Sequence, residues 1–238
     1  MNNRVALVTG SSRGIGREIA IRLADDVDGI AVHYRENIKA AEEVASEIRK
    51  KGKAVQAFQA DLTTESETRN LIRQVEEHFG RLDVLVSNFG PIIVKPWGEL
   101  ATADWELMFR SILLSAFWGT TSALPGMRER GWGRIINIGY HRVEQLTAFS
   151  GIAAYAVAKT GLLILTRSAA ATELKSGITV NMVSPGLIEG GIMPTGGKVS
   201  AEFFGTRLDV AEAVSFLASD RAKHINGTNL VVAGSWKM

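Results

Sequence analysis

The chain has 238 residues, of which 46% are hydrophobic and 22% charged, and its formal net charge is +2. It contains no cysteine, which excludes disulfides, thiol nucleophiles and thiolate metal sites. The charges form no basic patch of the kind that binds nucleic acid, and the apolar runs are too short for a membrane span or a signal peptide. We therefore expect a single domain over residues 1–238 in a cytoplasmic protein, with no nucleic-acid, membrane or metal partner.

Short apolar runs alternate with longer amphipathic segments along the chain. Continuous Val, Ile and Leu runs joined by helical crossovers are typical of a parallel sheet covered on both faces. The sequence therefore predicts an α/β fold, a doubly wound parallel sheet of about seven strands with helices on both faces. The expected strands are Val5–Thr9, Ile30–His33, Ala54–Gln59, Val84–Ser87, Arg134–Ile138, Thr179–Ser184 and Leu230–Val232, and the expected helices are Ile15–Ala24, Ile38–Lys51, Glu65–Phe79, Ala103–Arg130, Ala153–Lys175 and Asp209–Ser219.

The first expected strand runs directly into a glycine-rich turn, Thr9–Gly16 (TGSSRGIG), and a helix follows. Glycine permits a tight turn and lets the backbone approach a diphosphate at the helix N-terminus, where free N–H groups and the helix dipole favour negative charge. The spacing is G-x-x-x-G-x-G, not the general G-x-G-x-x-G dinucleotide pattern. Taken alone, the turn is equally consistent with a plain strand-to-helix connection.

Several segments in register resemble the short-chain dehydrogenase/reductase family, in particular its 3-oxoacyl-(acyl-carrier-protein) reductase-like members, over essentially the whole chain. They are Thr9–Gly16, Asp61-Leu62 after the third strand, Ser87–Gly90 (SNFG) after the fourth, Tyr155 with Lys159, and Pro185-Gly186 after the sixth. The resemblance implies a Rossmann-type fold, hydride transfer with a nicotinamide dinucleotide, and a homodimer or homotetramer. The cofactor contacts that it implies are Gly10, Ser12, Arg13, Gly14, Ile15 and Gly16 in the turn, Asp61 and Leu62 beside the adenine, Asn88 and Gly90 at the nicotinamide-side ribose, Tyr155 and Lys159, and Pro185, Gly186 and Ile188 at the nicotinamide.

The end of the second strand indicates which dinucleotide is bound. An acidic residue there would bind a ribose 2′-hydroxyl and repel a 2′-phosphate, but this chain has Tyr34 at that position, followed by Arg35. Arg35 and Arg13 of the glycine turn could bind a phosphate with charge-assisted bonds, whereas Glu36 lies one position late for the ribose. The arrangement favours NADP(H); the alternative is that both arginines are simply solvated.

Tyr155 and Lys159 are the candidate proton-transfer pair. They are four residues apart on an expected helix and therefore share a face. A phenol has an ordinary pKa near 10, and a neighbouring ammonium stabilises the phenolate, so we expect Lys159 to lower the pKa of Tyr155. Family resemblance implies that the tyrosine protonates a carbonyl oxygen and that the lysine also holds the ribose hydroxyls. The alternative is an exposed pair without function.

Two catalytic positions depart from the family pattern. Where the family has serine as a hydrogen-bond donor to the substrate oxygen, this chain has Tyr140 followed by His141. Loss of such a donor typically costs ~10²–10³ in rate, so we expect Tyr140, or alternatively His141, to supply it. The family asparagine falls on Ile112, which cannot hold a water; Ser111 could reroute the relay, while Ser115 more plausibly serves helix packing.

A loop follows the last of these motifs. Residues 186–205 are rich in glycine and contain Pro194, and both residue types break helical and strand periodicity, so we expect a flexible substrate loop there. The threonine that the family often has near position 190 is replaced by Gly190 and Gly191. Substrate identity is expected to depend on this loop and on residues 91–100.

Two classes of function stay open. The first is an NADPH-dependent oxidoreductase that reduces a carbonyl of the 3-oxoacyl type, or an activated C=C bond, with an altered set of catalytic residues. The second is an NADP(H)-binding protein with little or no catalysis. The expected partners are a small-molecule substrate and copies of the chain. Residues 160–174 are apolar around most of the helix circumference, which fits a central helix buried by its own domain, whereas the family resemblance implies a helix pair at a dimer interface.

Overall fold

The seven strands form one parallel sheet in the order β3-β2-β1-β4-β5-β6-β7 in the computed structural model, which describes residues 3–191 and 200–234. The strands are β1 Val5–Val8, β2 Gly29–Tyr34, β3 Ala54–Gln59, β4 Val84–Ser87, β5 Gly133–Ile138, β6 Ile178–Pro185 and β7 Asn229–Val232. The order reverses between β1 and β4, and open α/β sheets bind ligands at the carboxyl ends of the strands near such a switch point. The predicted doubly wound sheet is confirmed.

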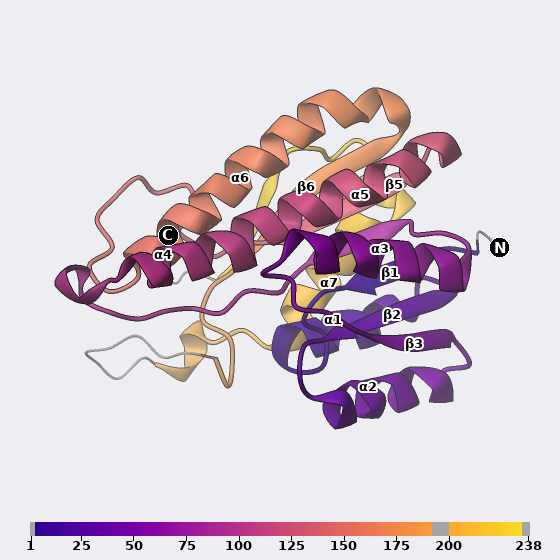
Figure 1. Ribbon diagram of the computed structural model, residues 1–238, viewed down its shortest axis with the longest axis horizontal. Coiled ribbons are helices and arrows are strands. Elements are labelled where there is room, and N and C mark those ends of the chain that lie inside the picture. The colour runs from indigo at the N-terminus through magenta and orange to yellow at the C-terminus, as the bar shows by residue number, and fades with distance from the viewer. Residues whose placement is uncertain (1–2, 192–199, 235–238) are drawn as a thin grey trace.

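Helices cover both faces of the sheet (Figure 1). One apolar core joins the sheet to α1, α2 and α7, and a second joins it to α3, α5 and α6. A third cluster, around the ends of β5 and β6, packs against the start of α6. The helices are α1 Gly14–Leu23, α2 Ile38–Lys50, α3 Glu65–Phe79, α4 Thr102–Met108, α5 Ser115–Arg130, α6 Ala153–Glu173 and α7 Arg207–Ala218, with single 3-10 turns η1 Trp97–Glu99, η3 Leu174–Ser176, η4 Ala201–Phe203 and η5 Asp220–Ala222.

The predicted helix 103–130 is helical along its whole length, but its interior is not a regular α-helix. A π-helical segment, η2 Phe109–Leu114, separates α4 from α5. Within it the hydroxyl of Ser111 donates to Leu107 O (2.5 Å), and that of Ser115 donates to Ser111 O (2.7 Å). Hydroxyls that bond back to the helix offer the backbone alternative partners, and π-helical turns are frequent at functional sites.

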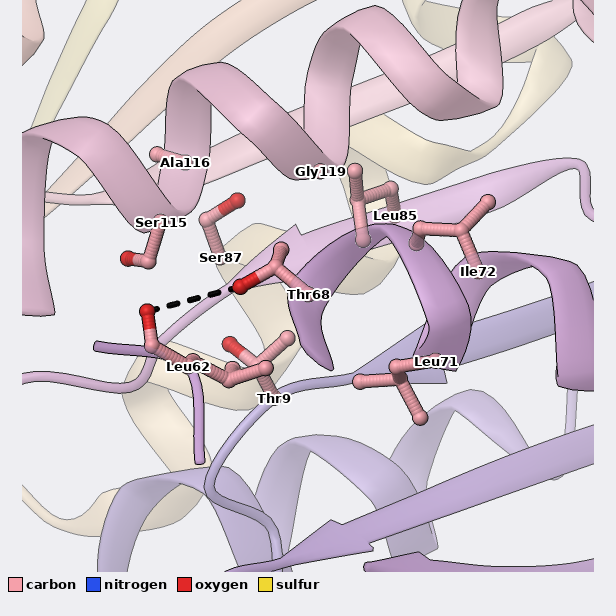
Figure 2. A pocket seen from close by; sticks show the side chains of 10 residues that line it. All are labelled: Thr9, Leu62, Thr68, Leu71, Ile72, Leu85, Ser87, Ser115, Ala116 and Gly119. Atoms are coloured by element: carbon pink, nitrogen blue, oxygen red, sulfur yellow. Dashed lines mark hydrogen bonds between the residues drawn. The ribbon is translucent and has the colours of Figure 1, made fainter. Parts of the chain in front are cut away.

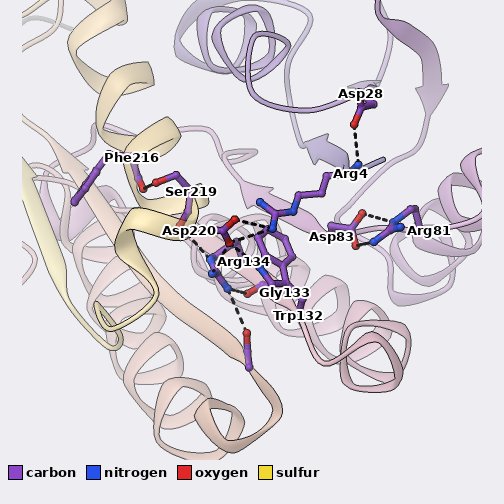
Figure 3. A network of polar contacts seen from close by, with 11 residues as sticks. Arg4, Asp28, Arg81, Asp83, Trp132, Gly133, Arg134, Phe216, Ser219 and Asp220 are labelled. Atoms are coloured by element: carbon purple, nitrogen blue, oxygen red, sulfur yellow. Dashed lines mark hydrogen bonds and ion pairs between the residues drawn. The ribbon is translucent and has the colours of Figure 1, made fainter. Parts of the chain in front are cut away.

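Ion pairs close the amino-terminal edge of the sheet (Figure 3). The guanidinium groups of Arg4 and Arg134 both lie over the ring of Trp132, 3.8 Å and 4.3 Å from its centre. Asp220 accepts from Arg4 Nη2 (2.9 Å) and from the Trp132 indole N–H (3.0 Å). The Asp83 side chain is fully buried and accepts from Val5 N and Arg81 Nε, at 3.0 Å and 2.7 Å.

The two ends of segment 186–205 are held together. Glu189 N donates to Gly205 O and Gly205 N donates to Leu187 O, at 3.0 Å and 2.9 Å. The middle of the predicted substrate loop, residues 192–199, lies outside the described residues. Among the helices that the structure describes, none is both long and apolar enough to cross a membrane.

Candidate active site

Two hollows adjoin at the carboxyl ends of the strands. A groove of about 510 Å³ runs along the glycine turn and the end of β2, and a pocket of about 580 Å³ lies over the ends of β5 and β6 and the start of α6. Both are lined by Ile15, Asn88, Gly90 and Ile188, so they form one continuous cleft. Of the predicted site residues, the groove is lined by Gly10, Ser12, Arg13, Gly14, Gly16, Tyr34 and Arg35, and the pocket by Tyr140, Tyr155, Lys159, Pro185 and Gly186.

Close backbone packing explains the glycines of the turn. Gly10 has φ +64°, a left-handed conformation that glycine adopts without strain. A Cβ at Gly16 would lie 2.5 Å from Gly10 O and 2.5 Å from Asn88 Nδ2, which is a steric clash. The Asn88 amide in turn donates to Thr9 O (2.9 Å), so the end of β4 fixes the shape of the turn.

His33 of β2 supports the same turn, and the sequence analysis did not find it. Its buried ring accepts from Gly10 N at Nδ1 (2.8 Å), and Nε2 lies 3.1 Å from Ala60 O. Nδ1 must therefore be unprotonated and Nε2 must carry the hydrogen. Burial lowers the pKa of His33 to about 4, although the contact with the Ala60 carbonyl favours protonation. A histidine inside an otherwise apolar strand was the available signal.

The basic side chains of the groove differ in their contacts. Arg35 pairs with its neighbour Glu36 (2.6 Å), and both are exposed. Arg13 is exposed and makes no ion pair within residues 3–191 and 200–234. Arg207, at the first position of α7, also lines the groove, and its Nη2 would lie 2.7 Å from a Cβ at Gly190. The Arg207 guanidinium therefore lies in the space that a side chain at position 190 would occupy. The sequence alone does not reveal this contact, because the two residues are far apart along the chain.

Asp61 and Leu62 do not line the cleft. The Asp61 carboxylate accepts from Thr63 N (3.0 Å) and from the Thr63 hydroxyl (2.8 Å). Leu62 is buried and lines a separate internal cavity of about 10 Å³ between α3, α5 and β4, where its carbonyl accepts from Thr68 (Figure 2). That volume holds about one water. A role for these two residues beside an adenine therefore stays a prediction.

The structure brings Tyr155 and Lys159 to the pocket from one face of α6, as predicted. Lys159 is buried, its Nζ lies 5.7 Å from the Tyr155 ring centre, and it donates to Ile138 O at the end of β5 (2.5 Å). Burial lowers the pKa of Lys159 to about 8. The ammonium thus satisfies a backbone carbonyl, which orients it at the base of the pocket.

The expected lowering of the Tyr155 pKa is wrong for this arrangement. Burial raises the pKa of Tyr155, and the neighbouring Tyr140 adds to the increase. Water is excluded around the hydroxyl, and a desolvated phenolate is costly, so burial determines the direction of the pKa shift. Tyr155 is therefore protonated at neutral pH, as a proton donor must be.

Tyr140 occupies the pocket wall beside Tyr155, with ring centres 5.5 Å apart and an interplanar angle of 63°. It is buried, and its hydroxyl has no hydrogen-bond partner among the residues that the structure describes. Burial raises the pKa of Tyr140 to about 12, which the charge of Arg142 partly offsets. A buried hydroxyl without a partner costs stability, so this one is available to a ligand oxygen. His141 lines the same pocket, and the choice between the two as donor stays a prediction.

Ile112, at the position of the missing asparagine, is buried beside Gly90. A Cβ at Gly90 would approach Ile112 Cγ1 to 2.9 Å. The hydroxyls of Ser111 and Ser115 are bonded to carbonyls of their own helix, and a relay through Ser111 stays a prediction. Ser115 is buried at the start of α5, which is consistent with a packing role.

The end of β6 completes the floor of the pocket. Pro185 O accepts from His141 N and Gly186 N donates to Val232 O, both at 2.9 Å. A Cβ at Gly186 would lie 2.6 Å from the Cβ of Ala233, so only glycine fits there. Within the described ranges, no three His, Asp or Glu residues are placed to hold a metal ion. The site therefore offers phenols, an ammonium and backbone groups for proton transfer.

Comparisons with known proteins agree with this geometry. The model of the short chain dehydrogenase family matches residues 4–196. The chain is 36% identical over 244 residues to the 3-oxoacyl-(acyl-carrier-protein) reductase FabG of Staphylococcus aureus, with 98% of each chain covered. A blue fluorescent protein from a metagenomic library, solved with NADPH, has a TM-score of 0.91 at 34% identity over 100% of this chain and 99% of that one. A short chain dehydrogenase from Burkholderia cenocepacia, solved with NADP, has a TM-score of 0.88 at 31% identity, covering 98% and 97%.

Proposed function

The chain belongs to the short-chain dehydrogenase family, and from this premise we propose that it is an NADPH-dependent reductase that acts on a ketone of the 3-oxoacyl type or a related one. The observation that carries the proposal is the pocket itself, where two phenols, Tyr140 and Tyr155, stand together above the Lys159 ammonium. The adjoining groove supplies a place for a dinucleotide.

The residues of the groove fit a dinucleotide phosphate. The turn at Gly10 and Gly14 presents backbone at the N-terminus of α1, and a Cβ at Gly14 would meet nothing within 4 Å, so the groove is open there. Unpaired N–H groups and the helix dipole favour a diphosphate at such a point. Arg13 and Arg35 flank the end of β2, where the side chain is Tyr34 and not a carboxylate, and this favours NADP(H) over NAD(H).

The chemistry of the pocket suits carbonyl reduction. A bound reduced nicotinamide supplies the hydride. Tyr155 holds the proton that the carbonyl oxygen receives, and its raised pKa keeps it protonated until that oxygen becomes strongly basic. Lys159, held by Ile138 O, places a positive charge near the phenolate that forms. The unpartnered hydroxyl of Tyr140 can donate a second hydrogen bond to the same oxygen, replacing the missing serine.

A dinucleotide-binding protein without turnover is the second candidate. It is favoured by Ile112, which cannot hold a relay water, and by the two serine hydroxyls that are bonded to the helix backbone. Reduction of an activated C=C bond is a variant of the first candidate and would use the same phenols.

Initial rates of NADPH oxidation separate these possibilities. The purified protein is assayed with β-keto esters, quinones and enones, and nicotinamide fluorescence measures NADPH binding in the same preparation. We expect turnover of at least one ketone, with NADPH preferred to NADH by more than about tenfold, the size of effect that one lost charged contact produces. NADPH binding without turnover of any compound would favour the binding protein, and turnover of enones alone would favour the C=C variant.

The exposed apolar side chains of α5 and α6 support the proposed dimer. Phe117 of α5 is 43% exposed, and Val157 and Ile164 of α6 are 48% and 64% exposed, which is unusual for large apolar residues on two neighbouring helices. A two-fold pair of these helices would bury them. The four-subunit assembly is a further proposal.

A further inference from the structure

The charged groups of the pocket all have one sign. Among the described residues, Arg142 and Lys159 line it and no Asp or Glu does. The adjoining groove differs, because Glu36 and Glu189 line it together with its arginines. A pocket with cations and no carboxylate attracts an anion and disfavours a cation.

Arg142 is held in place without being neutralised. Its Nε donates to Gln145 Oε1 (2.6 Å), and its guanidinium lies 4.8 Å from the ring centre of Phe149. It makes no ion pair among the described residues, unlike Arg4, Arg128 and Arg134. The contacts fix the plane of the guanidinium, and its two terminal nitrogens have no hydrogen-bond acceptor within residues 3–191 and 200–234. Such an arrangement lowers the entropy lost when a planar anion binds.

A row of rings connects this guanidinium to the candidate proton donor. Ring centres are 5.5 Å apart between Tyr155 and Tyr140 and 5.9 Å apart between Tyr140 and Phe149, and Arg142 lies over the far ring. The charge of Arg142 also favours ionisation of the Tyr140 hydroxyl, although burial raises the pKa of that group. The apolar wall is completed by Ile92, Val94, Ile152 and Leu187.

We propose that Arg142 binds the carboxylate of the substrate, and that the substrate is therefore an oxo acid with an apolar body. The inference rests on the proposed reductase function and names its substrate class. One guanidinium edge matches one planar carboxylate, with two parallel N–H···O bonds. A dianionic phosphate would call for a second cation at the same place, and Lys159 already donates to Ile138 O. The ketone then lies toward Tyr155, with the carboxylate at the Arg142 end of the row of rings.

Matched substrates test the assignment. kcat/KM is measured for a series of aliphatic and aryl oxo acids and for their methyl esters, with wild type, Arg142→Gln and Arg142→Lys. The control is Arg221→Gln, because Arg221 also lies over a phenylalanine, Phe216, at 5.5 Å, but outside the residues that line the cleft.

We expect wild type to prefer an acid to its ester by about 30-fold or more, a range typical of a charged contact. Arg142→Gln should lower kcat/KM for the acid by about 100-fold and for the ester by less than about threefold, because only the acid uses the charge. Arg142→Lys should recover part of the loss. Arg221→Gln should match wild type. Equal effects of Arg142→Gln on acid and ester, or none on either, would overturn the proposal.

A binding experiment separates this proposal from the reductase proposal. The NADPH complex is titrated by calorimetry with non-reducible carboxylic acids, their amides and the matching phosphonates. We expect the acid to bind about tenfold or more tighter than the amide, and the difference to vanish in Arg142→Gln. That result without any turnover would retain Arg142 and reject the reductase. Equal binding of acid and amide, no binding of either, or tighter binding of the phosphonate would overturn the carboxylate assignment even if esters are reduced.

Discussion

At the amino-terminal ends of the strands, Arg4 and Arg134 contact the indole of Trp132 and pair with Asp220. The buried Asp83 carboxylate accepts four hydrogen bonds, from Val5, Arg81 and Arg130. At the carboxyl ends, the Tyr140 hydroxyl has no partner within the described residues, and burial shifts the pKa values of Tyr155 and Lys159 away from their ordinary values. Both edges bury polar groups of one continuous sheet. The Asp83 and Asp220 carboxylates are satisfied by the protein's own atoms, whereas the Tyr140 hydroxyl has no partner among the described residues.

The difference teaches where stability and function are located. A paired, hydrogen-bonded charge strengthens the fold only while every partner is present, and an unpaired buried group weakens it. The carboxyl edge therefore lowers the stability of the fold and leaves groups ready for a ligand. Substitutions at the two edges should change stability in opposite directions, and each of the following experiments depends on that contrast.

The largest effect is expected for Lys159→Met. Loss of the ammonium should lower kcat/KM by about 10³-fold, within the range for groups that take part in proton transfer. The folded-state pKa of about 8 lies below the ordinary 10.5, so charge on this lysine destabilises the folded protein below pH 8, and the cost disappears as the pH rises toward 10.5. The variant should thus be more stable than wild type by about 2 kcal/mol at pH 7.

Urea unfolding at pH 7 and pH 9 measures this gain, which should shrink by about 1 kcal/mol at the higher pH. Lys50→Met, at an exposed lysine of α2, is the control and should change neither stability nor rate appreciably. A less stable Lys159→Met protein would break the contrast between the two edges.

Asp83→Asn tests the opposite edge. Removing the charge leaves Arg81 and Arg130 without their shared carboxylate, so the free energy of unfolding should fall by about 3 kcal/mol. kcat/KM of the folded fraction should stay unchanged. Asp25→Asn, at the more exposed pair with Lys51, should cost less than about 1 kcal/mol. Equal losses for the two variants in urea unfolding would show that the amino edge contributes no special stability.

Tyr140→Phe removes one hydroxyl and should change activity and stability in opposite directions. Removing the hydroxyl deletes a hydrogen-bond donor to the substrate oxygen, which should lower kcat/KM by about 10²-fold. It also removes a buried group without a partner, so the protein should become more stable by about 1 kcal/mol. The checks are steady-state kinetics and thermal unfolding of the same preparation. A destabilised variant with full activity would mean that the hydroxyl serves the fold and not the reaction.

His33 makes the groove sensitive to acid. Its folded-state pKa of about 4 lies below the ordinary 6.5, so stability is full above pH 6.5 and falls as the pH decreases through that value toward 4. Between pH 7 and pH 4.5 the free energy of unfolding of wild type should fall by about 2 kcal/mol more than that of His33→Gln. Urea unfolding at each pH measures both. His78→Gln, at an exposed histidine of α3, should lose the same amount as wild type. Parallel pH curves for wild type and His33→Gln would contradict this assignment.

Local patterns in the sequence were sufficient for the strands and for the core of the site. Fully buried strands such as Val5–Val8 and Val84–Ser87 appear as continuous apolar runs, and helical spacing places Tyr155 and Lys159 on one face. The glycines of the turn could be located because a diphosphate-binding backbone needs them at a strand–helix junction.

Groups brought together by tertiary packing could not be predicted in this way. The bond from Gly10 N to His33, the contact of Arg207 with Gly190, and the stacking of Arg142 on Phe149 each join segments or side chains whose geometry depends on the folded chain. The pKa of Tyr155 was predicted in the wrong direction because sequence spacing shows the nearby charge and not the exclusion of water. The π-helical turn around Ile112 was similarly not predicted, because the apolar pattern of residues 103–130 indicates only one regular helix.

Tyr155→Phe, assayed in a single turnover with NADPH bound and a ketone that wild type reduces, tests the carboxyl edge most directly. We expect NADPH affinity within about threefold of wild type and a rate of NADPH oxidation lower by about 10³-fold, because only the proton donor is lost. A variant that oxidises NADPH within about tenfold of the wild-type rate would contradict the assignment of this phenol as the acid.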